Sequence, residues 1–418
     1  MLPSLLSRAG LSRRLLLAAT AGVPLDAFAQ AAKKPAPTVA HRPPGKVGRK
    51  PSEMLPVGSP AQTPIGPLES EAKFAVIIDH TSGATLLDKD ADVSQPPSSM
   101  TKLMTAYLVY EQLKAGKLTL NQELPVSERA WRMGGSKMFV ALNTSVRVED
   151  LIRGMIVQSG NDACIVLAEG IAGSEEGFVE KMNAKAKQFA LTNTNFRNCT
   201  GWPDADHRMT VRDIATVAQH LITDFPEYYK YDAEKSFKYN GIDQLNRNTL
   251  VQKGIADGLK TGHTEAGGYG LVASSDRGGR RVIVVVNGLP SMRARAEEGE
   301  RLLEWAFREF ENVNLFAAVD VIEQAPVWLG SSSTVPLVGG RDLVLTMPRN
   351  WRQKAKVALD YDSPIPAPIA RGTKLGVLTV RGDGVPEMDV PLLAGADVDR
   401  LGLPGRAIAV MSHYLLGA

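Results

Sequence analysis

Three short polar motifs follow one another along the 418 residues, and their residue types suit one reaction. They are Ser99-Met100-Thr101-Lys102, Ser159-Gly160-Asn161 and Lys260-Thr261-Gly262. A serine hydroxyl becomes a good nucleophile when a nearby base removes its proton. A lysine amine can be that base if burial and a neighbouring cation disfavour its ammonium form. The motifs therefore predict acyl transfer through a covalent serine intermediate, with Ser99 as nucleophile and Lys102 as base.

The three motifs differ in how specific they are. The S-x-x-K pattern occurs twice, because Ser70-Glu71-Ala72-Lys73 also fits, whereas S-x-N and K-T-G occur once each. By composition, a K-T-G triplet is expected only about 0.1 times in a chain of this length. Alone, Ser99 and Lys102 would suit an ordinary helix start and a solvated charge. The presence of all three motifs in one chain favours a catalytic role for these residues over a purely structural one.

Local context separates the two S-x-x-K matches. Ser99 opens a segment, residues 100–114, whose apolar residues recur at helical spacing, so Ser99 and Lys102 lie one turn apart on one face. Ser70 precedes an apolar strand pattern, in which residues three apart point to opposite faces. Only Ser99 is expected to meet its lysine.

The elements that must position these residues come in three blocks. Two strands are expected at 74–79 and 84–88, around a Ser-Gly turn. Helical spacing then recurs in 100–114, 148–157, 162–171, 175–189 and 211–222. Strands return at 269–274 and 281–286, before a helix at 297–311. This order predicts one sheet whose two ends come together in space.

The second and third motifs fall at junctions between these elements. Ser159-Gly160-Asn161 lies between two apolar helical segments, where Gly160 would let the chain turn; a simple helix cap is the alternative. Lys260-Thr261-Gly262 reads as the start of a strand, where Gly262 would allow a ligand close to the backbone; a turn is the alternative. Lys260 would supply the second cation near Lys102.

The pattern of residue types changes after Asn312. Short runs rich in β-branched residues, divided by turns, occupy 334–338, 343–346, 356–360 and 375–380. They predict a small all-β domain that extends to about residue 400. The apolar tail, residues 401–418, is expected to contain a short helix, and peripheral membrane contact through it stays open.

The N-terminal region has the features of an export signal followed by a linker. Residues 1–29 combine Arg8, Arg13 and Arg14 with a short apolar run and an Ala-Phe-Ala site, which predicts a signal peptide. The apolar run falls short of the roughly 18 residues that a spanning helix needs. Residues 30–70 hold nine of the 26 prolines and are basic, as in an extended linker. General and twin-arginine export both remain open.

Charge and cysteine content exclude several classes of protein. The net charge is +3, but nine of the 48 basic and three of the 45 acidic residues lie in residues 1–70, so the remainder is slightly acidic. No nucleic-acid surface is indicated. Cys164 and Cys199 exclude a disulfide framework and a CxxC metal site; two free buried thiols are favoured over one disulfide. We expect no metal and no cofactor.

The residues around the motifs carry a family resemblance. The stretches concerned are Ala91–Val93, Gln158–Cys164, Gln244–Asn248, Lys260–Thr264 and Gly268-Tyr269. With its S-x-x-K, S-G-N and K-T-G set, the sequence resembles the low-molecular-mass penicillin-binding proteins, the serine D-alanyl-D-alanine carboxypeptidases of the peptidase S11 type. The resemblance covers about residues 72–312, and the β domain is similar to the C-terminal module of that family.

The resemblance implies a fold and an activity. The fold is a β-lactamase/transpeptidase-like α/β (α+β) domain, an antiparallel sheet with a helical cluster, at 71–312, followed by the all-β domain at 313–400. The activity is removal of the terminal D-alanine from peptidoglycan stem peptides, with β-lactams as covalent inhibitors. The implied location is the bacterial periplasm or cell envelope, with contact to the outer face of the inner membrane left open.

The resemblance also implies roles for individual residues. Ser159 and Lys260 would relay a proton to the departing amine, and Asn161 would hold Lys102 and the substrate amide. Backbone N–H groups of Ser99 and His263 would form the oxyanion hole. The substrate-binding residues implied are Thr261, Gly262, His263 and Arg295.

Thr261 and Arg295 are expected to bind the terminal carboxylate of the substrate. Arg295 is matched by its place shortly before Leu302-Leu303, and Arg293 is its rival. The alternative for both arginines is an exposed pair on a loop.

Three alternative functions stay open. A serine β-lactamase of class A would deacylate with a glutamate in E-x-x-L-N. Phe139 and Ile242 stand at that place before Leu142-Asn143 and Leu245-Asn246, which favours slow release of penicillin. A DD-endopeptidase would use the same acyl transfer. A non-catalytic wall-binding scaffold would keep the fold alone. Some relatives have a histidine near the Gly201 turn that this chain lacks, and the nearby His207 has no assigned role.

Overall fold

The computed structural model describes residues 58–340, 342–351, 355–382 and 385–416. The expected signal peptide, and the expected linker as far as residue 57, lie outside the described residues. The expected linker is wrong for residues 58–70: Ala61 is fully buried in a core cluster, and Gln62 forms a β-bridge with Asp88. Among the helices in the described ranges, none combines the length and the apolar character needed to cross a bilayer.

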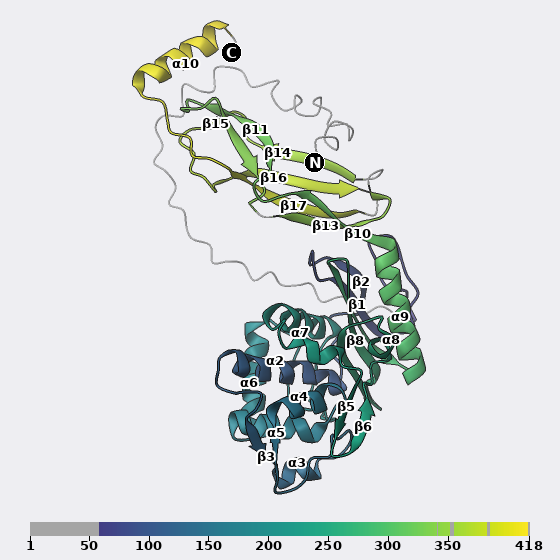
Figure 1. The fold of residues 1–418 in the computed structure, drawn as a ribbon. Coiled ribbons are helices and arrows are strands. Elements are labelled where there is room, and N and C mark those ends of the chain that lie inside the picture. Colours follow the sequence, from purple (N-terminus) through teal and green to yellow (C-terminus); the bar gives the residue numbers. More distant parts are fainter. Residues whose placement is uncertain (1–57, 341, 352–354, 383–384, 417–418) are drawn as a thin grey trace. The chain divides into compact units, whose positions relative to one another are not determined.

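A five-stranded antiparallel sheet in the order β2-β1-β9-β8-β7 forms the centre of the first domain (Figure 1). Its strands are β1 (Phe74–Asp79), β2 (Thr85–Lys89), β7 (Gly258–Thr264), β8 (Gly268–Arg277) and β9 (Arg280–Leu289). Val76 of β1 pairs with Val285 of β9, so strands from the two ends of the domain are neighbours. This confirms the predicted closure of the sheet.

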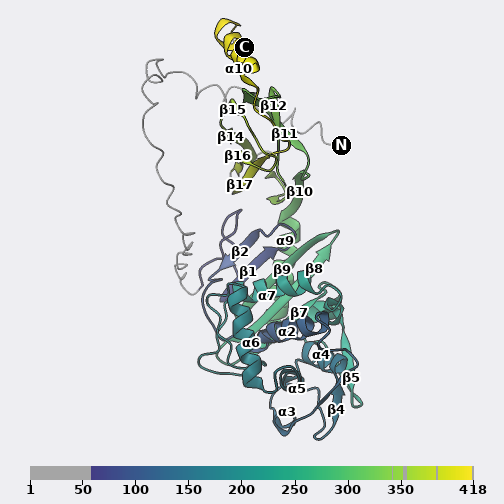
Figure 2. The same cartoon turned by 90° about the vertical axis from the view of Figure 1, so that its left-hand side faces the viewer.

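Helices cover both faces of this sheet (Figures 1 and 2). The helices are α2 (Lys102–Lys114), α4 (Val148–Ile156), α5 (Asn161–Ala172), α6 (Glu175–Gln188), α7 (Val211–Asp224), α8 (Thr249–Lys253) and α9 (Met292–Glu309). Alternate residues of β9 face opposite ways: Ile283 and Val285 pack into the core with α2 and α4–α7, whereas Val284 and Val286 pack with Leu302 of α9. Burial on both faces explains why residues 282–286, the central part of β9, are all apolar.

Short elements complete the first domain. They are the turns η3 (Ser98–Thr101) and η4 (Tyr229–Ala233), the helix α3 (Glu128–Arg132), and the strands β3 (Glu123–Pro125), β4 (Ser145–Arg147), β5 (Ser236–Tyr239) and β6 (Ile242–Leu245). Strands β3 and β4 pair with each other, as do β5 and β6.

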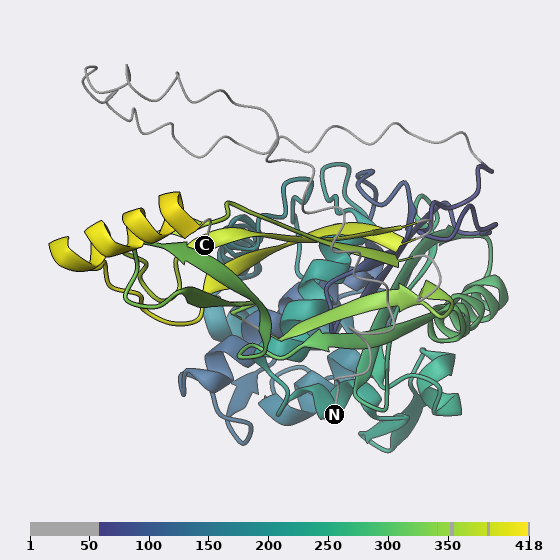
Figure 3. The same ribbon diagram turned by 90° about the horizontal axis from the view of Figure 1, so that it is seen from above.

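The second domain is all-β, as the sequence predicted. Its strands are β10 (Phe310–Phe316), β11 (Val321–Trp328), β12 (Thr334–Val338), β13 (Leu343–Pro348), β14 (Ala355–Tyr361), β15 (Ile365–Pro366), β16 (Lys374–Gly382) and β17 (Val385–Ala394). Six of them form a sheet in the order β14-β16-β17-β12-β11-β15, and β10 pairs with β13. Figure 3 shows these green and yellow strands from another side. Its core includes Leu337, Leu378 and Leu392. The tail helix α10 (Leu403–Leu416) follows.

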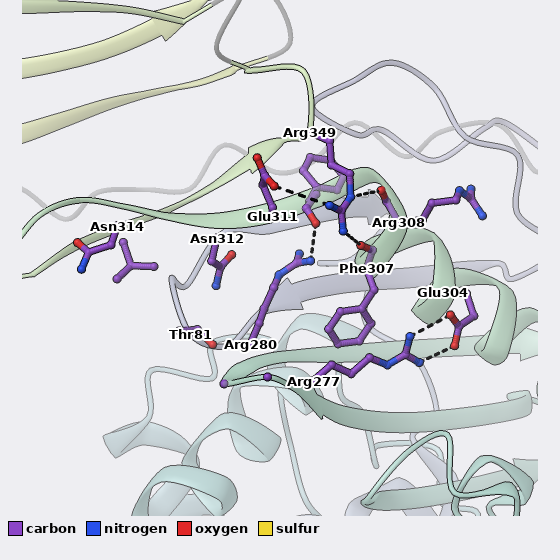
Figure 4. A pocket seen from close by; sticks show the side chains of 14 residues that line it. Thr81, Arg277, Arg280, Glu304, Phe307, Arg308, Glu311, Asn312, Asn314 and Arg349 are labelled. Carbon is purple, nitrogen blue, oxygen red and sulfur yellow. Dashed lines mark hydrogen bonds and ion pairs between the residues drawn. The ribbon is translucent and has the colours of Figure 1, made fainter. Parts of the chain in front are cut away.

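A pocket of about 620 Å³ lies where β9, α9, β10 and β13 meet (Figure 4). The guanidinium of Arg280 donates to Asp79 Oδ2 at 2.7 Å and to the carbonyl oxygen of Phe310 at 2.6 Å. Arg349 donates to the carbonyl oxygen of Phe307 at 3.0 Å. The cations of this pocket are therefore tied to carboxylates and to backbone carbonyls.

Candidate active site

The nucleophile candidate Ser99 lies on a 3₁₀ turn rather than on the first turn of an α-helix. The turn η3 spans Ser98–Thr101, and α2 begins only at Lys102. Two prolines precede this turn and have no backbone N–H to donate, so the chain enters α2 through one tight turn. In a 3₁₀ turn, residues three apart eclipse each other, which places Ser99 and Lys102 on the same side.

The Lys102 amine is buried and has three acceptors. Its Nζ donates to Ser99 Oγ at 2.9 Å, to Asn161 Oδ1 at 2.8 Å and to the carbonyl oxygen of Thr200 at 2.6 Å. The residue is only 1% exposed, and in the part of the chain that the structure describes it forms no ion pair. Burial lowers the pKa of Lys102, and the charge of Arg247 contributes in the same direction. A lysine in this setting can give up its proton and then accept one from Ser99.

The second motif forms the loop between α4 and α5, but its turn differs from the expectation. Ser159, not Gly160, takes the left-handed conformation, with φ of 60°. A methyl group on Gly160 would lie 3.1 Å from the carbonyl oxygen of Gly154 and 3.1 Å from the backbone nitrogen of Met138. Gly160 is thus required by close packing, and a strained backbone holds Ser159, which is 2% exposed.

Two contacts fix the orientation of Asn161. Its Nδ2 donates to the carbonyl oxygen of Gly134 at 2.8 Å, which turns Oδ1 towards Lys102. The neighbouring Asp162 carboxylate accepts the backbone N–H groups of Met138 and Phe139 at 3.0 and 2.9 Å. The loop that supplies the Gly134 carbonyl is therefore tied to the start of α5.

The third motif lies on the edge strand β7, directly against the turn that carries Ser99. A methyl group on Gly262 would lie 2.0 Å from Ser98 Oγ, so only glycine permits this approach. Lys260 is 3% exposed, and its Nζ donates to the carbonyl oxygen of Thr261 at 3.2 Å. Burial, the main cause, and the charge of Lys102 lower the pKa of Lys260 well below its ordinary value.

Hydrogen bonds join only some of the predicted site residues. Ser99, Lys102 and Asn161 are connected directly through the Lys102 amine. Among the hydrogen bonds of the described residues, none joins Ser159 to Lys260, although both side chains are buried. The expected proton relay between these two residues is thus not preformed as a direct contact.

The Tyr269 ring lies close to two of the predicted substrate-binding residues, His263 and Arg295. The His263 ring stacks on the Tyr269 ring with centroids 3.9 Å apart, and the Arg295 guanidinium lies 6.0 Å from the same ring. Arg295 also donates to the carbonyl oxygen of Arg247 at 3.3 Å. Burial lowers the pKa of Arg295 to about 10. Thr261, on the same strand as His263, is buried.

The two rival arginines occupy different environments on α9, not on a loop. Arg295 is buried, at 7% exposure, whereas Arg293 is exposed and paired with Glu297 at 2.7 Å. In the other S-x-x-K match, residues 70–73, Ser70 Oγ donates to Glu298 Oε1 at 2.7 Å. Ser70 therefore serves the packing of α9.

Four groups of this site were not predicted as site residues. Arg247 and Tyr269 lie within stretches that carry the family resemblance, so a signal for them was present. The backbone carbonyls of Gly134 and Thr200, which hold Asn161 and Lys102, have no signature in the sequence.

His207 lies behind the Ser99 turn and not beside the hydroxyl. Its Nδ1 accepts the backbone N–H of Arg197 at 3.4 Å, so its Nε2 carries the proton and donates to Thr101 Oγ1 at 3.0 Å. Burial lowers the pKa of His207 to about 4, which keeps the ring neutral at pH 7. It contacts the turn through Thr101.

The cysteines are not candidate nucleophiles. Cys164 and Cys199 are both free and buried. Burial raises the pKa of Cys164 to about 12 and that of Cys199 well above its ordinary value, so neither forms a thiolate at neutral pH.

Comparison with known proteins identifies the family. Residues 60–291 match the family model of peptidase S11, D-alanyl-D-alanine carboxypeptidase. The chain belongs to the peptidase S11 family. Residues 310–400 match the C-terminal domain of penicillin-binding protein 5. Membership makes the chain a serine hydrolase of the D-alanyl-D-alanine carboxypeptidase class, as the sequence predicted.

Individual S11 relatives agree over most of the chain. D-alanyl-D-alanine carboxypeptidase DacA of Haemophilus influenzae is 39% identical, over 82% of this chain and 89% of that protein. DacC of Escherichia coli is 38% identical, over 80% and 86%. The crystal structure of penicillin-binding protein 5 from Haemophilus influenzae superposes with a TM-score of 0.74 at 38% identity and covers 80% of this chain and 100% of that one.

Proposed function

We propose that this chain removes the terminal D-alanine from peptidoglycan stem peptides through an acyl-enzyme on Ser99. The observation that carries the proposal is the buried Lys102 amine, 2.9 Å from Ser99 Oγ and without a carboxylate partner in the described structure. Such an amine loses its proton more readily than a solvated lysine, and the hydroxyl is its neighbour.

The contact between Ser99 and Lys102 supports the first part of the proposed acylation step, and the other roles are those that the family resemblance implies. Lys102 takes the proton of Ser99 as Oγ attacks the carbonyl carbon between the two D-alanines, and an ester bond forms. The carbon–nitrogen bond then breaks, and a proton passes by way of Ser159 and Lys260 to the nitrogen of the departing D-alanine. Water later hydrolyses the ester and restores Ser99. Backbone N–H groups of Ser99 and His263 stabilise the oxyanion.

The substrate is held at its carboxylate end. Arg295 is a buried cation with no carboxylate partner among the described residues, and it lies near His263 through Tyr269. We assign the terminal carboxylate to Arg295 and Thr261. Gly262 leaves the edge strand free of a side chain where the peptide backbone would approach.

Mass spectrometry of a synthetic pentapeptide ending in D-Ala-D-Ala tests the reaction. We expect loss of one D-alanine with the wild-type protein and none with Ser99→Ala. An identical peptide with an amidated C-terminus is the control for carboxylate recognition and should react more slowly. An intact pentapeptide after incubation with folded wild-type protein would contradict the proposal, and cleavage only of cross-linked dimers would indicate a DD-endopeptidase.

Penicillin separates the remaining alternatives. A relative, penicillin-binding protein D2 of Listeria monocytogenes, has a crystal structure in an ampicillin-bound form at 28% identity and a TM-score of 0.53, which covers 57% of this chain and 98% of that one. We expect fluorescent penicillin to label wild type and not Ser99→Ala. Unlabelled wild type would favour a scaffold, and turnover of benzylpenicillin at many cycles per second would favour a β-lactamase.

We further propose an envelope location and the domain limits predicted from the sequence. Residues 1–29 would be removed on export, residues 71–312 would carry the reaction and residues 313–400 would form a separate module. N-terminal sequencing of the mature protein should begin at Gln30. A mature protein that begins at Met1 would contradict export by cleavage.

The tail helix is proposed to contact the membrane surface. On α10, Leu403, Ile408 and Met411 are 75%, 66% and 61% exposed. Co-sedimentation of the full chain with phosphatidylglycerol vesicles should fall when Ile408 and Met411 are both replaced by serine. The exposed Val357→Ser is the control. Equal sedimentation of the double variant and wild type would contradict membrane contact through α10.

A further inference from the structure

The turn of residues 198–202 touches three parts of the acylating site at once. The carbonyl oxygen of Thr200 accepts the Lys102 amine at 2.6 Å. Gly201 has φ of 81°, and a methyl group on it would lie 1.8 Å from the carbonyl oxygen of Ser98, so the turn abuts the residue before the nucleophile. Its third contact is made by Trp202.

The Trp202 ring packs on the backbone that orients Asn161. A methyl group on Gly134 would lie 3.2 Å from Trp202 Cη2. One on Gly135 would lie 2.9 Å from Trp202 Cζ3 and 2.9 Å from Asn161 Nδ2. The indole and the Asn161 amide thus both lie against the backbone of Gly134 and Gly135. The carbonyl of Gly134 is the acceptor that turns Asn161 Oδ1 towards Lys102.

Asn198 holds this turn in one conformation. Its Oδ1 accepts the backbone N–H groups of Gly201 and Trp202 at 2.7 and 3.0 Å, and its Nδ2 donates to the carbonyl oxygen of Trp202 at 2.9 Å. The turn is therefore rigid where it meets Lys102 on one side and the Gly134–Gly135 backbone on the other.

We propose that Trp202 is a positioning residue for acylation, because it clamps the Gly134–Gly135 turn and so keeps Asn161 aligned on the Lys102 amine. Trp202 is 45% exposed, so it is not a core residue whose main effect is on folding. The inference rests on the proposed acylation of Ser99 and adds a residue to which that proposal gives no role.

The predicted effect has two parts. Removal of the ring frees the Gly134 carbonyl and Asn161, so the rate of acylation by penicillin should fall by about tenfold, a fraction of what a positioned base contributes. Asn161 Oδ1 accepts the Lys102 amine, and such an acceptor favours the ammonium form, so loss of this contact lowers the pKa of Lys102. Because the neutral amine is the base, the acid limb of the acylation rate should move to lower pH.

The test compares Trp202→Ala with Trp131→Ala, a control residue of similar exposure, 41%, on α3. The acylation rate constant is measured against pH for both variants and wild type, with thermal unfolding as a check on folding. We expect a slower rate and an acid limb at lower pH for Trp202→Ala alone, and a smaller change for Trp202→Phe. If Trp202→Ala does not fold, Trp202→Leu replaces it, with the same expectation.

Two results would overturn the proposal. One is a folded Trp202→Ala variant whose acylation rate constant, and the pH of whose acid limb, equal those of wild type. The other is a slower rate with an unmoved limb, because positioning through Asn161 and Lys102 requires the limb to shift. If wild type itself is not acylated, the proposed function fails instead, so the two failures are distinguishable.

Discussion

Two regions of this chain contain buried cations, and the partners of these cations differ. In the pocket of Figure 4, the buried Arg280 is paired with the fully buried Asp79, and the exposed Arg277 is paired with Glu304. At the Ser99 turn, Lys102 and Lys260 are equally buried, but neither forms an ion pair among the described residues. Arginine does not lose its proton in proteins, whereas a desolvated lysine does so readily. The first arrangement holds structure together, and the second prepares a base.

The largest expected effect comes from removal of that base. Lys102→Met should lower the rate of penicillin acylation by about a thousandfold or more, because no other group contacts Ser99 Oγ as a proton acceptor in the described structure. Its melting temperature should equal or exceed that of wild type, since a desolvated amine is lost from the core. Stopped-flow labelling and calorimetry measure both.

The control for this variant is Arg277→Met in the pocket of Figure 4, which should leave the acylation rate unchanged. Acylation of Lys102→Met within tenfold of wild type would remove the distinction between the two regions.

The next effect should appear in stability and not in activity. Arg280→Met leaves the Asp79 carboxylate buried without its guanidinium, which we expect to cost about 3–5 kcal/mol in the free energy of unfolding. Urea denaturation measures the loss, and the double variant Arg280→Met/Asp79→Asn should recover part of it. A loss below about 1 kcal/mol would show that the pair is not structural.

Arg295 tests whether a buried, unpaired cation serves the substrate. Arg295→Ala should lower kcat/KM for a peptide with a free C-terminal carboxylate by about 10- to 100-fold, the worth of a hydrogen bond to a charged group. Penicillin acylation should fall less. Arg293→Ala is the control, because Arg293 is exposed and paired with Glu297. Equal losses for peptide and penicillin would count against the role of Arg295.

The smallest effect is expected at the other S-x-x-K match, residues 70–73. Ser70→Ala removes the hydrogen bond to Glu298 and should cost about 1 kcal/mol of stability. Labelling by penicillin should be unchanged. A tenfold slower labelling would mean that the wrong S-x-x-K motif had been assigned.

Much of the fold was predictable because periodicity reports burial. The helices of the cluster and the strands β1, β8 and β9 were expected near their observed positions, and the fold class is confirmed. The start of α2 was less predictable, because the 3₁₀ turn of Ser98–Thr101 depends on packing against β7.

The site was predictable where side-chain chemistry marks it. The pairing of Ser99 with Lys102 followed from spacing on one helical face. The carbonyls of Thr200 and Gly134 were not predictable, since every residue has a carbonyl and only the fold selects one. The left-handed Ser159 was unexpected for a similar reason: tertiary packing, and not glycine, determines that turn.

The pH dependence of Ser99 acylation tests the central claim most directly, namely that Lys102 acts as an unpaired, desolvated base. The pKa of Lys102 is lowered from its ordinary value of 10.5, so the neutral amine should be populated, and acylation fast, at pH values below 10.5. As pH falls through the lowered pKa, the rate should decline with a slope of one proton. An acid limb close to pH 10.5, or a rate that does not depend on pH in wild type and Lys102→Met alike, would contradict the account.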